Sequence, residues 1–269
     1  MFIPINSEAQ KFQCSACGTC CSHIRGIIPK EDREFLSQYA FGKMPVIQLV
    51  PVEQMTFPLW DWEAKRFSEW QNEADVDANI KPLRVIFDLR SNKTIILNYF
   101  MDGKTDACPF LKNNKCSIYH TKRAYVCRLF PFSRSPFSFQ QENISKESLF
   151  GECGAMKNIL PNVPEDFEKM VRFLNDSFPD GSFINAVQND IVVEWMNKTI
   201  IALIKNKIIK PAVNHPYDVL LKQIESAEKT DFTDFLVQCG FLTEKEKEDL
   251  ISRFDNNIDA KEKISQFIQ

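Results

Sequence analysis

Residues 12–28 read FQCSACGTCCSHIRGII, and the interpretation of the whole chain depends on the four cysteines in this stretch. Cys14, Cys17, Cys20 and Cys21 follow a Cys-x2-Cys-x2-Cys-Cys spacing. A buried structural cysteine behaves as a small apolar residue and needs no partner at a fixed interval. A CxxC turn, by contrast, brings two sulfurs to one ion, and overlapping CxxC turns bring three. The stretch therefore predicts a metal site, with a disulfide framework as the alternative.

A second group of cysteines lies in residues 108–132, which read CPFLKNNKCSIYHTKRAYVCRLFPF, and one more follows at position 153. This group contains no CxxC pair, so we expect the two groups to close one site together in three dimensions. The predicted metal ligands are Cys14, Cys17, Cys20, Cys21, Cys108, Cys116, Cys127 and Cys153. The ninth cysteine, Cys239, lies on an apolar helical face and is expected to be a buried core thiol.

Eight thiols can hold one iron–sulfur cluster with spare ligands, two zinc ions, or one group of each kind. CxxCxxC is ferredoxin-like spacing and structural zinc more often uses separated CxxC pairs, so iron–sulfur is favoured over zinc. Radical chemistry with S-adenosylmethionine is disfavoured, because it uses CxxxCxxC. Gly18 can take the positive φ that lets the backbone fold around a central atom. His23 and His120 are weaker candidate ligands, since thiols are already in surplus.

Residues 108–134 carry six lysines and arginines and no acidic residue, although the whole chain is slightly acidic. Nearby cations favour the thiolate form that binds metal. An anionic substrate or cofactor, or an ordinary solvated surface, would also account for the bias. Arg128 directly follows Cys127 and is the predicted cofactor-binding residue, because its guanidinium could donate to a cluster sulfur or to a carboxylate near it. A surface ion pair is the alternative for Arg128.

Composition restricts the class of protein. The chain has 269 residues and a net charge of −3, which gives no reason to expect a nucleic-acid or anionic-membrane partner. Charged residues interrupt the most apolar segment, residues 191–209, so no membrane span is expected. MFIPINSEAQKF, residues 1–12, lacks a cationic segment that leads into an apolar stretch. With nine cysteines and no such signal, we expect a cytoplasmic protein.

Hydrophobic periodicity predicts an α+β protein in two parts. Residues 83–89 and 95–99 alternate in polarity around a turn at 91–93, which is typical of a β-hairpin. Helical patterns cover residues 165–178, 184–208, 217–228 and 232–239, and Thr243 with Glu246 forms a capping box for another helix. We therefore predict a cysteine-rich metal-binding domain with a small β-hairpin at residues 1–160, followed by an all-α domain at 161–269.

The order of these motifs resembles a known family. The CxxCxxCC run, followed by CPFL, CxIY and Arg-x3-CRLFPF, is similar to the YkgJ-like cysteine-cluster proteins, a zinc- or iron-chelating family that includes flagellin lysine N-methylases. The resemblance covers roughly residues 12–153 and places Arg128 and Pro131 on the family's CRxFP signature. Ala124 departs from it, because the family usually has proline after the arginine at that position.

Three functions remain open from the sequence, and whether the chain is an enzyme stays undecided. The first is a metal-cluster protein with a redox or accessory role. The second, implied by the resemblance, is an S-adenosylmethionine-dependent protein lysine N-methyltransferase, although the sequence has no GxGxxG cofactor loop. The third is a zinc-stapled interaction module. In the last two cases the helical tail would bind a protein substrate or partner.

Overall fold

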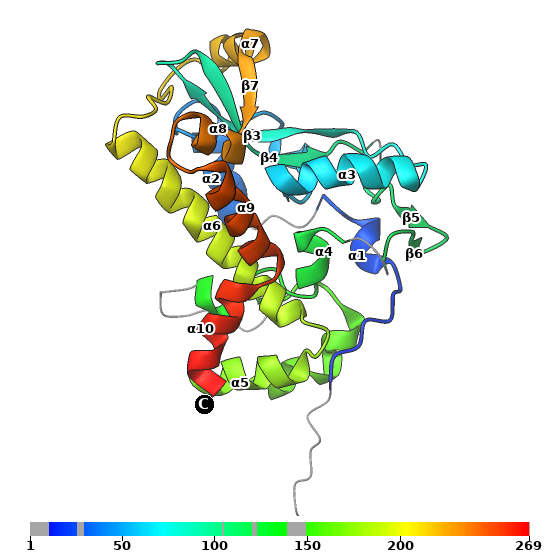
Figure 1. The fold of residues 1–269 in the computed structure, drawn as a ribbon. Coiled ribbons are helices and arrows are strands. Elements are labelled where there is room, and N and C mark those ends of the chain that lie inside the picture. Colours follow the sequence, from blue (N-terminus) through cyan, green and yellow to red (C-terminus); the bar gives the residue numbers. More distant parts are fainter. Residues whose placement is uncertain (1–10, 26–29, 104, 120–122, 139–148, 269) are drawn as a thin grey trace, which may run out of the picture. The chain divides into compact units, whose positions relative to one another are not determined.

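A computed structural model describes residues 11–25, 30–103, 105–119, 123–138 and 149–268 (Figure 1). The chain divides into two compact units, each built from separate segments. The first unit comprises Met1–Cys20, Tyr125–Trp195 and Ser252–Gln269, and the second comprises Cys21–Ala124 and Met196–Ile251. These units do not follow the predicted boundary at residue 160, and the division into domains at 1–160 and 161–269 stays a prediction.

The described elements confirm the α+β class. The helices are α1 (Thr19–Ser22), α2 (Lys30–Tyr39), α3 (Asp61–Glu73), α4 (Tyr125–Leu129), α5 (Phe167–Ser177), α6 (Ser182–Lys205), α7 (Tyr217–Ser226), α8 (Phe232–Gln238), α9 (Glu244–Asp255) and α10 (Ile258–Ile268). The strands are β1 (Ile47–Gln48), β2 (Leu59–Trp60), β3 (Ile80–Asp88), β4 (Lys93–Met101), β5 (Leu111–Lys112), β6 (Lys115–Cys116) and β7 (Glu228–Asp231). Short 3-10 helices lie at Val52–Gln54, Pro136–Ser138, Gly154–Asn158 and Leu160–Asn162.

The second unit is built on a sheet in which the strand order is β1-β3-β4-β2. Strands β3 and β4 form the predicted hairpin, which is confirmed. The side chain of Asp88 stabilises its turn by accepting hydrogen bonds from the backbone N–H groups of Arg90 and Ser91. Asn92 adopts a left-handed φ of 55°, a conformation that asparagine tolerates better than most residues. The hairpin is therefore specified locally.

Strand β7 is an addition to the predicted all-α C-terminal region. It pairs in parallel with residues 93–96 of β4, at one end of the strand, and β2 pairs with the other end. Its sequence, EKTD, has neither the length nor the alternation that would reveal a strand. The helical pattern before it ends at Ser226, two residues short of the predicted end. The pairing with β4 therefore comes from tertiary structure.

The first unit is helical and has an aromatic core. The ring of Phe178 lies 5.1 Å from that of Phe12 and 4.7 Å from that of Phe132, centroid to centroid. The backbone N–H of Phe12 also donates to the carbonyl of Ser177, at 2.7 Å. The residue two positions before the first cysteine is thus fastened to the C-terminal end of α5, more than 160 positions along the chain.

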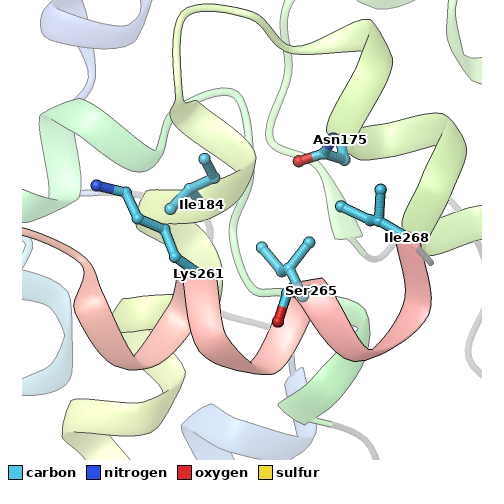
Figure 2. Close-up of a pocket in the computed structure, with 6 residues that line it drawn as sticks. Asn175, Ile184, Lys261, Ser265 and Ile268 are labelled. Atoms are coloured by element: carbon cyan, nitrogen blue, oxygen red, sulfur yellow. The ribbon is translucent and has the colours of Figure 1, made fainter.

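The C-terminal helix α10 packs against α5 within this unit (Figure 1). Its residues Ala260 and Ile264 are buried in the aromatic core. Beside that core, α5, α6 and α10 border an open hollow of about 380 Å³. Figure 2 shows Asn175 and Ile184 on one side of this hollow and Ser265 on the other. None of the eight predicted metal ligands is among the residues that line it.

Candidate metal centre

All nine cysteines lie among the described residues, and none of them is in a disulfide. The first unit contains Cys14, Cys17, Cys20, Cys127 and Cys153. The second unit contains Cys21, Cys108 and Cys116, together with Cys239. The division falls between the adjacent cysteines Cys20 and Cys21, within α1. The predicted metal ligands therefore form two groups, one in each unit.

The loop from Cys14 to α1 reverses direction through two residues with left-handed backbone. Gly18 has a φ of 78°, as its position between the cysteines predicts, and Ala16 has a φ of 51°. Alanine rarely adopts this conformation, so sequence alone gives no reason to expect it there. The N–H of Ala16 donates to the sulfur of Cys14 at 3.4 Å. The loop thus already donates an N–H to one sulfur.

Cys17 has a local environment that favours the thiolate. Its sulfur lies 3.2 Å from the hydroxyl oxygen of Thr19. Hydrogen bonds from the Thr19 side chain, then from the Thr19 backbone and the Ser15 side chain, lower the pKa of Cys17 below that of an ordinary thiol. Because the thiolate is the form that binds metal, this environment suits the ligand role that the sequence predicts for this exposed cysteine.

Cys153 belongs to the same thiol group although it is distant in sequence. It precedes the 3-10 helix Gly154–Asn158 and packs against the same aromatic core as Cys14. Burial raises the pKa of Cys153, and the negative charges of Cys14, Cys17 and Cys20 raise it further. Four thiols of the first unit therefore lie within electrostatic range of one another. A metal ion in their midst would reverse this repulsion, because its positive charge stabilises all four thiolates.

Cys127 lies on the short helix α4, which the C-terminal part of the first unit holds in place. The buried hydroxyl of Tyr125 donates to the carbonyl of Phe254, at the end of α9. The guanidinium of Arg128 lies 4.2 Å from the centre of the Tyr125 ring, and its Nη1 donates to the carbonyl of Asp255 at 3.5 Å. Arg128 thus contacts a backbone carbonyl and an aromatic ring here.

One atom of Arg128 is a donor without a partner: its Nε is buried and has no hydrogen-bond acceptor within the described part of the chain. A buried N–H donor without a partner carries a desolvation cost, which a negatively charged sulfur would remove. This orphaned donor, on the residue next to Cys127, suits a thiolate-bound metal or cluster. Together with a donor set made of thiols, it fits a soft metal.

Backbone hydrogen bonds link the segments that carry the three thiols of the second unit. The N–H of Cys108 donates to the carbonyl of Cys21 at 2.7 Å. Strands β5 and β6 then pair Leu111 with Cys116, through a turn at residues 113–114. Both turn residues are asparagines with positive φ, as a two-residue hairpin requires. The turn at residues 113–114 therefore places Cys116 opposite Leu111.

The other predicted features have simpler outcomes. Among the described residues, no three Cys, His, Asp or Glu side chains already lie where they would jointly hold an ion. His120 and Lys122 lie outside the described residues. Of the basic stretch, Arg123 stacks on the ring of Tyr119 at 4.6 Å, and the ammonium of Lys112 donates to the carbonyl of Ala74. Both basic side chains thus have local contacts.

The residues and their arrangement define a cysteine-cluster, metal-binding protein. A family model agrees with this class: it is named CxxCxxCC, carries the description "Putative zinc- or iron-chelating domain" and matches residues 13–153. These are 141 of the 269 residues, slightly more than half. The chain belongs to this family, as the order of motifs predicts. No curated protein and no solved structure matches it.

No described helix combines the length and apolar character that crossing a membrane requires. This agrees with the interruption of the segment at residues 191–209 by charged side chains. The cytoplasmic location stays a prediction.

Proposed function

We propose that the first unit holds an iron–sulfur cluster through Cys14, Cys17, Cys20 and Cys153, and that the chain has a redox or accessory role. One observation carries this proposal: three thiols at CxxCxxC spacing and one remote thiol belong to one unit, where Cys14 and Cys153 pack against the same aromatic core. In ferredoxins with two clusters, a CxxCxxC run likewise supplies three ligands to one cluster and a distant cysteine supplies the fourth. Structural zinc sites more often use separated CxxC pairs.

The surrounding residues have defined roles in this proposal. A bound cluster would supply one-electron chemistry at a potential set by burial and by hydrogen bonds to its sulfurs. The aromatic core around Phe12 and Phe178 would limit water on one side of the thiols. The Thr19 hydroxyl and the Arg128 Nε would donate hydrogen bonds to sulfur. Cys127 is the alternative fourth ligand, because it belongs to the same unit.

The test is an anaerobic purification followed by analysis of iron, acid-labile sulfide and visible absorption. We expect stoichiometric iron and sulfide with a broad charge-transfer band. Cys153→Ala should lose this band if Cys153 is the fourth ligand, and Cys127→Ala should lose it if Cys127 is. Cys239→Ala is the matched control, because Cys239 is not a predicted ligand. Its thiol lies 3.5 Å from the Leu236 carbonyl, at the end of α8. Colourless protein with stoichiometric zinc and no iron would refute the proposal.

The same preparation also tests the two other functions that the sequence leaves open. Binding of S-adenosylmethionine, measured by calorimetry, would favour the lysine methyltransferase. Zinc without colour would favour the interaction module, in which metal stabilises the fold and the helices bind a protein partner.

A further inference from the structure

Three polar side chains form a row across the sheet of the second unit. Gln48 of β1 pairs with Arg84 of β3, and Arg84 in turn pairs with Asn98 of β4. Residues paired across neighbouring strands have their side chains on the same face, close enough to interact. The adjacent residues Ile47 and Val85 belong to an apolar cluster with residues of α7, so the row lies on the other face of β1 and β3.

Arg84 brings a positive charge into this row without a counter-ion. Its side chain is partly buried. Burial lowers the pKa of Arg84, and no hydrogen bond or neighbouring charge within the described part of the chain opposes this effect. A guanidinium nevertheless stays charged at neutral pH. The fold therefore carries a desolvated cation whose cost no carboxylate of the described residues offsets.

The two neighbours of Arg84 in the row each have a buried acceptor without a donor. Gln48 is 0% exposed and Asn98 is 4% exposed. Nε2 of Gln48 donates to the carbonyl of Val50 at 3.0 Å, which orients the amide and leaves its Oε1 for another partner. Neither Oε1 of Gln48 nor Oδ1 of Asn98 receives a hydrogen bond from the described residues. Buried acceptors of this kind are rare, because each loses its hydrogen bond to water on folding.

The backbone at Arg84 is irregular on both sides. The register of β3 against β4 shifts between Pro82 and Arg84, and it shifts again between Arg84 and Val85. Such irregularities re-aim side chains and are over-represented next to functional sites. The pairing of Arg84 with Asn98 is thus set apart from the regular pairing of the hairpin above and below it.

An aromatic pair closes one end of the row. Asn98 also pairs with Trp60 of β2, and the Trp60 ring stacks on that of Trp62 at a centroid distance of 5.7 Å. Both tryptophans are 5% exposed. Hydrogen bonds and ion pairs formed beside such an apolar group are strengthened, because the local dielectric constant is low.

We infer that the row of Gln48, Arg84 and Asn98 binds a small carboxylate that carries a hydrogen-bond donor, an ammonium or a hydroxyl group, on the neighbouring carbon. The planar guanidinium matches a carboxylate, and the two amide oxygens accept from the donor group. One ligand then neutralises the charge and satisfies both acceptors, whereas a water molecule would leave the charge unpaired. Arg84 is the most exposed of the three residues, so the ligand enters at its side of the row. The inference does not depend on the group that the first unit holds.

The experiment is a calorimetric titration of the full-length protein, purified anaerobically, with three carboxylates of two carbons each. Glycine has an ammonium group beside the carboxylate, glycolate has a hydroxyl group there, and acetate has no donor. We expect glycine or glycolate to bind at least ~10-fold more tightly than acetate, which is the effect of two hydrogen bonds of ordinary strength. The tighter of the two identifies the donor. Inorganic phosphate is the fourth probe and should bind more weakly than the tighter of the two.

Two variants of similar volume test the row itself. Arg84→Met removes the charge and Asn98→Leu removes one unsatisfied oxygen, so both should weaken binding of the preferred carboxylate by at least ~10-fold. Without ligand, both should keep or raise the midpoint of thermal unfolding, because each removes a buried polar group that has no partner. A purely structural role for these side chains would lower the midpoint.

Arg90→Met is the matched control, because it removes a positive charge from the same hairpin. The Arg90 side chain donates to the carbonyl of Lys207, and this variant should bind the carboxylate like the wild type. The inference would be overturned if neither glycine nor glycolate bound, if acetate or phosphate bound as tightly as they do, or if Arg84→Met kept the wild-type affinity. None of these outcomes concerns iron, so the proposed function stands or falls separately.

Discussion

The two compact units arrange their thiols by different means. In the first unit, Cys14 and Cys153 belong to one group because Phe12 is fastened to the end of α5 and both cysteines pack on the aromatic core. In the second unit, Cys21, Cys108 and Cys116 are connected by backbone hydrogen bonds and a two-residue hairpin turn. In both units the thiols come from distant segments, which the aromatic core joins in the first unit and the backbone hydrogen bond between Cys108 and Cys21 joins in the second. Mutations in the aromatic core should therefore weaken metal binding by the first unit.

The adjacent cysteines give the largest expected effect and the sharpest test of this comparison. Cys20→Ala should lose the iron of the first unit, whereas Cys21→Ala should keep it. The reason is that Cys20 is one of the four proposed ligands of the cluster and Cys21 is not. Elemental analysis of the two purified variants measures the iron. If Cys21→Ala loses the iron as well, the proposed set of four ligands is wrong.

A buried carboxylate gives the second unit a pH dependence of its own. Asp61 is fully buried, and its Oδ2 accepts from the backbone N–H and the hydroxyl of Thr233, at 2.8 and 2.7 Å. Burial raises its pKa from 3.8 to about 6, although the hydrogen bonds from Thr233 oppose this shift. Because the pKa of Asp61 is higher in the folded than in the unfolded protein, folding favours the protonated carboxyl. Its contribution to the free energy of unfolding is fully present below pH 3.8 and is lost as the pH rises through 6.

Relative to Asp61→Asn, the wild type should lose about 3 kcal/mol of unfolding free energy between about pH 4 and pH 7, because one pKa unit corresponds to about 1.4 kcal/mol. Urea unfolding at several pH values measures this difference. Asp75→Asn, which alters an exposed carboxylate just after α3, is the control and should run parallel to the wild type. Parallel curves for wild type and Asp61→Asn would show that Asp61 titrates normally.

A smaller effect on the free energy of unfolding is expected in the first unit, from the hydrogen bond that joins α4 to the end of α9. Tyr125→Phe removes the hydroxyl that donates to the Phe254 carbonyl, which keeps its hydrogen bond from the Asn257 N–H. We expect a loss of about 0.5–1.5 kcal/mol in unfolding free energy, the usual value of one hydrogen bond. Iron should also be released faster to a chelator.

Tyr39→Phe is the matched control, because the Tyr39 side chain lies on the surface of α2 and its ring contact with Phe35 does not need the hydroxyl. Equal iron release from Tyr125→Phe and the wild type would mean that α4 does not depend on the end of α9.

Sequence predicts those features whose causes are local. The alternation of residues 83–89 and 95–99 predicts the β3–β4 hairpin, and Thr243 and Glu246 form the expected capping box. Sequence does not predict helix α10 or strand β7. The helix is stabilised by packing on the aromatic core, and the strand by pairing with β4. In the site, the cysteine spacing predicts metal ligands. It does not predict that Cys20 and Cys21 belong to different units, because that depends on long-range contacts such as the hydrogen bond between Cys21 and Cys108, which lie more than 80 residues apart.

The discontinuous units have a consequence for biosynthesis. When the ribosome has added residue 195, every predicted metal ligand has been made, the last of them at position 153. Neither unit is complete, however, because the second still needs residues 196–251 and the first needs residues 252–269. The nascent chain therefore carries eight thiols before it has the segments that complete their surroundings.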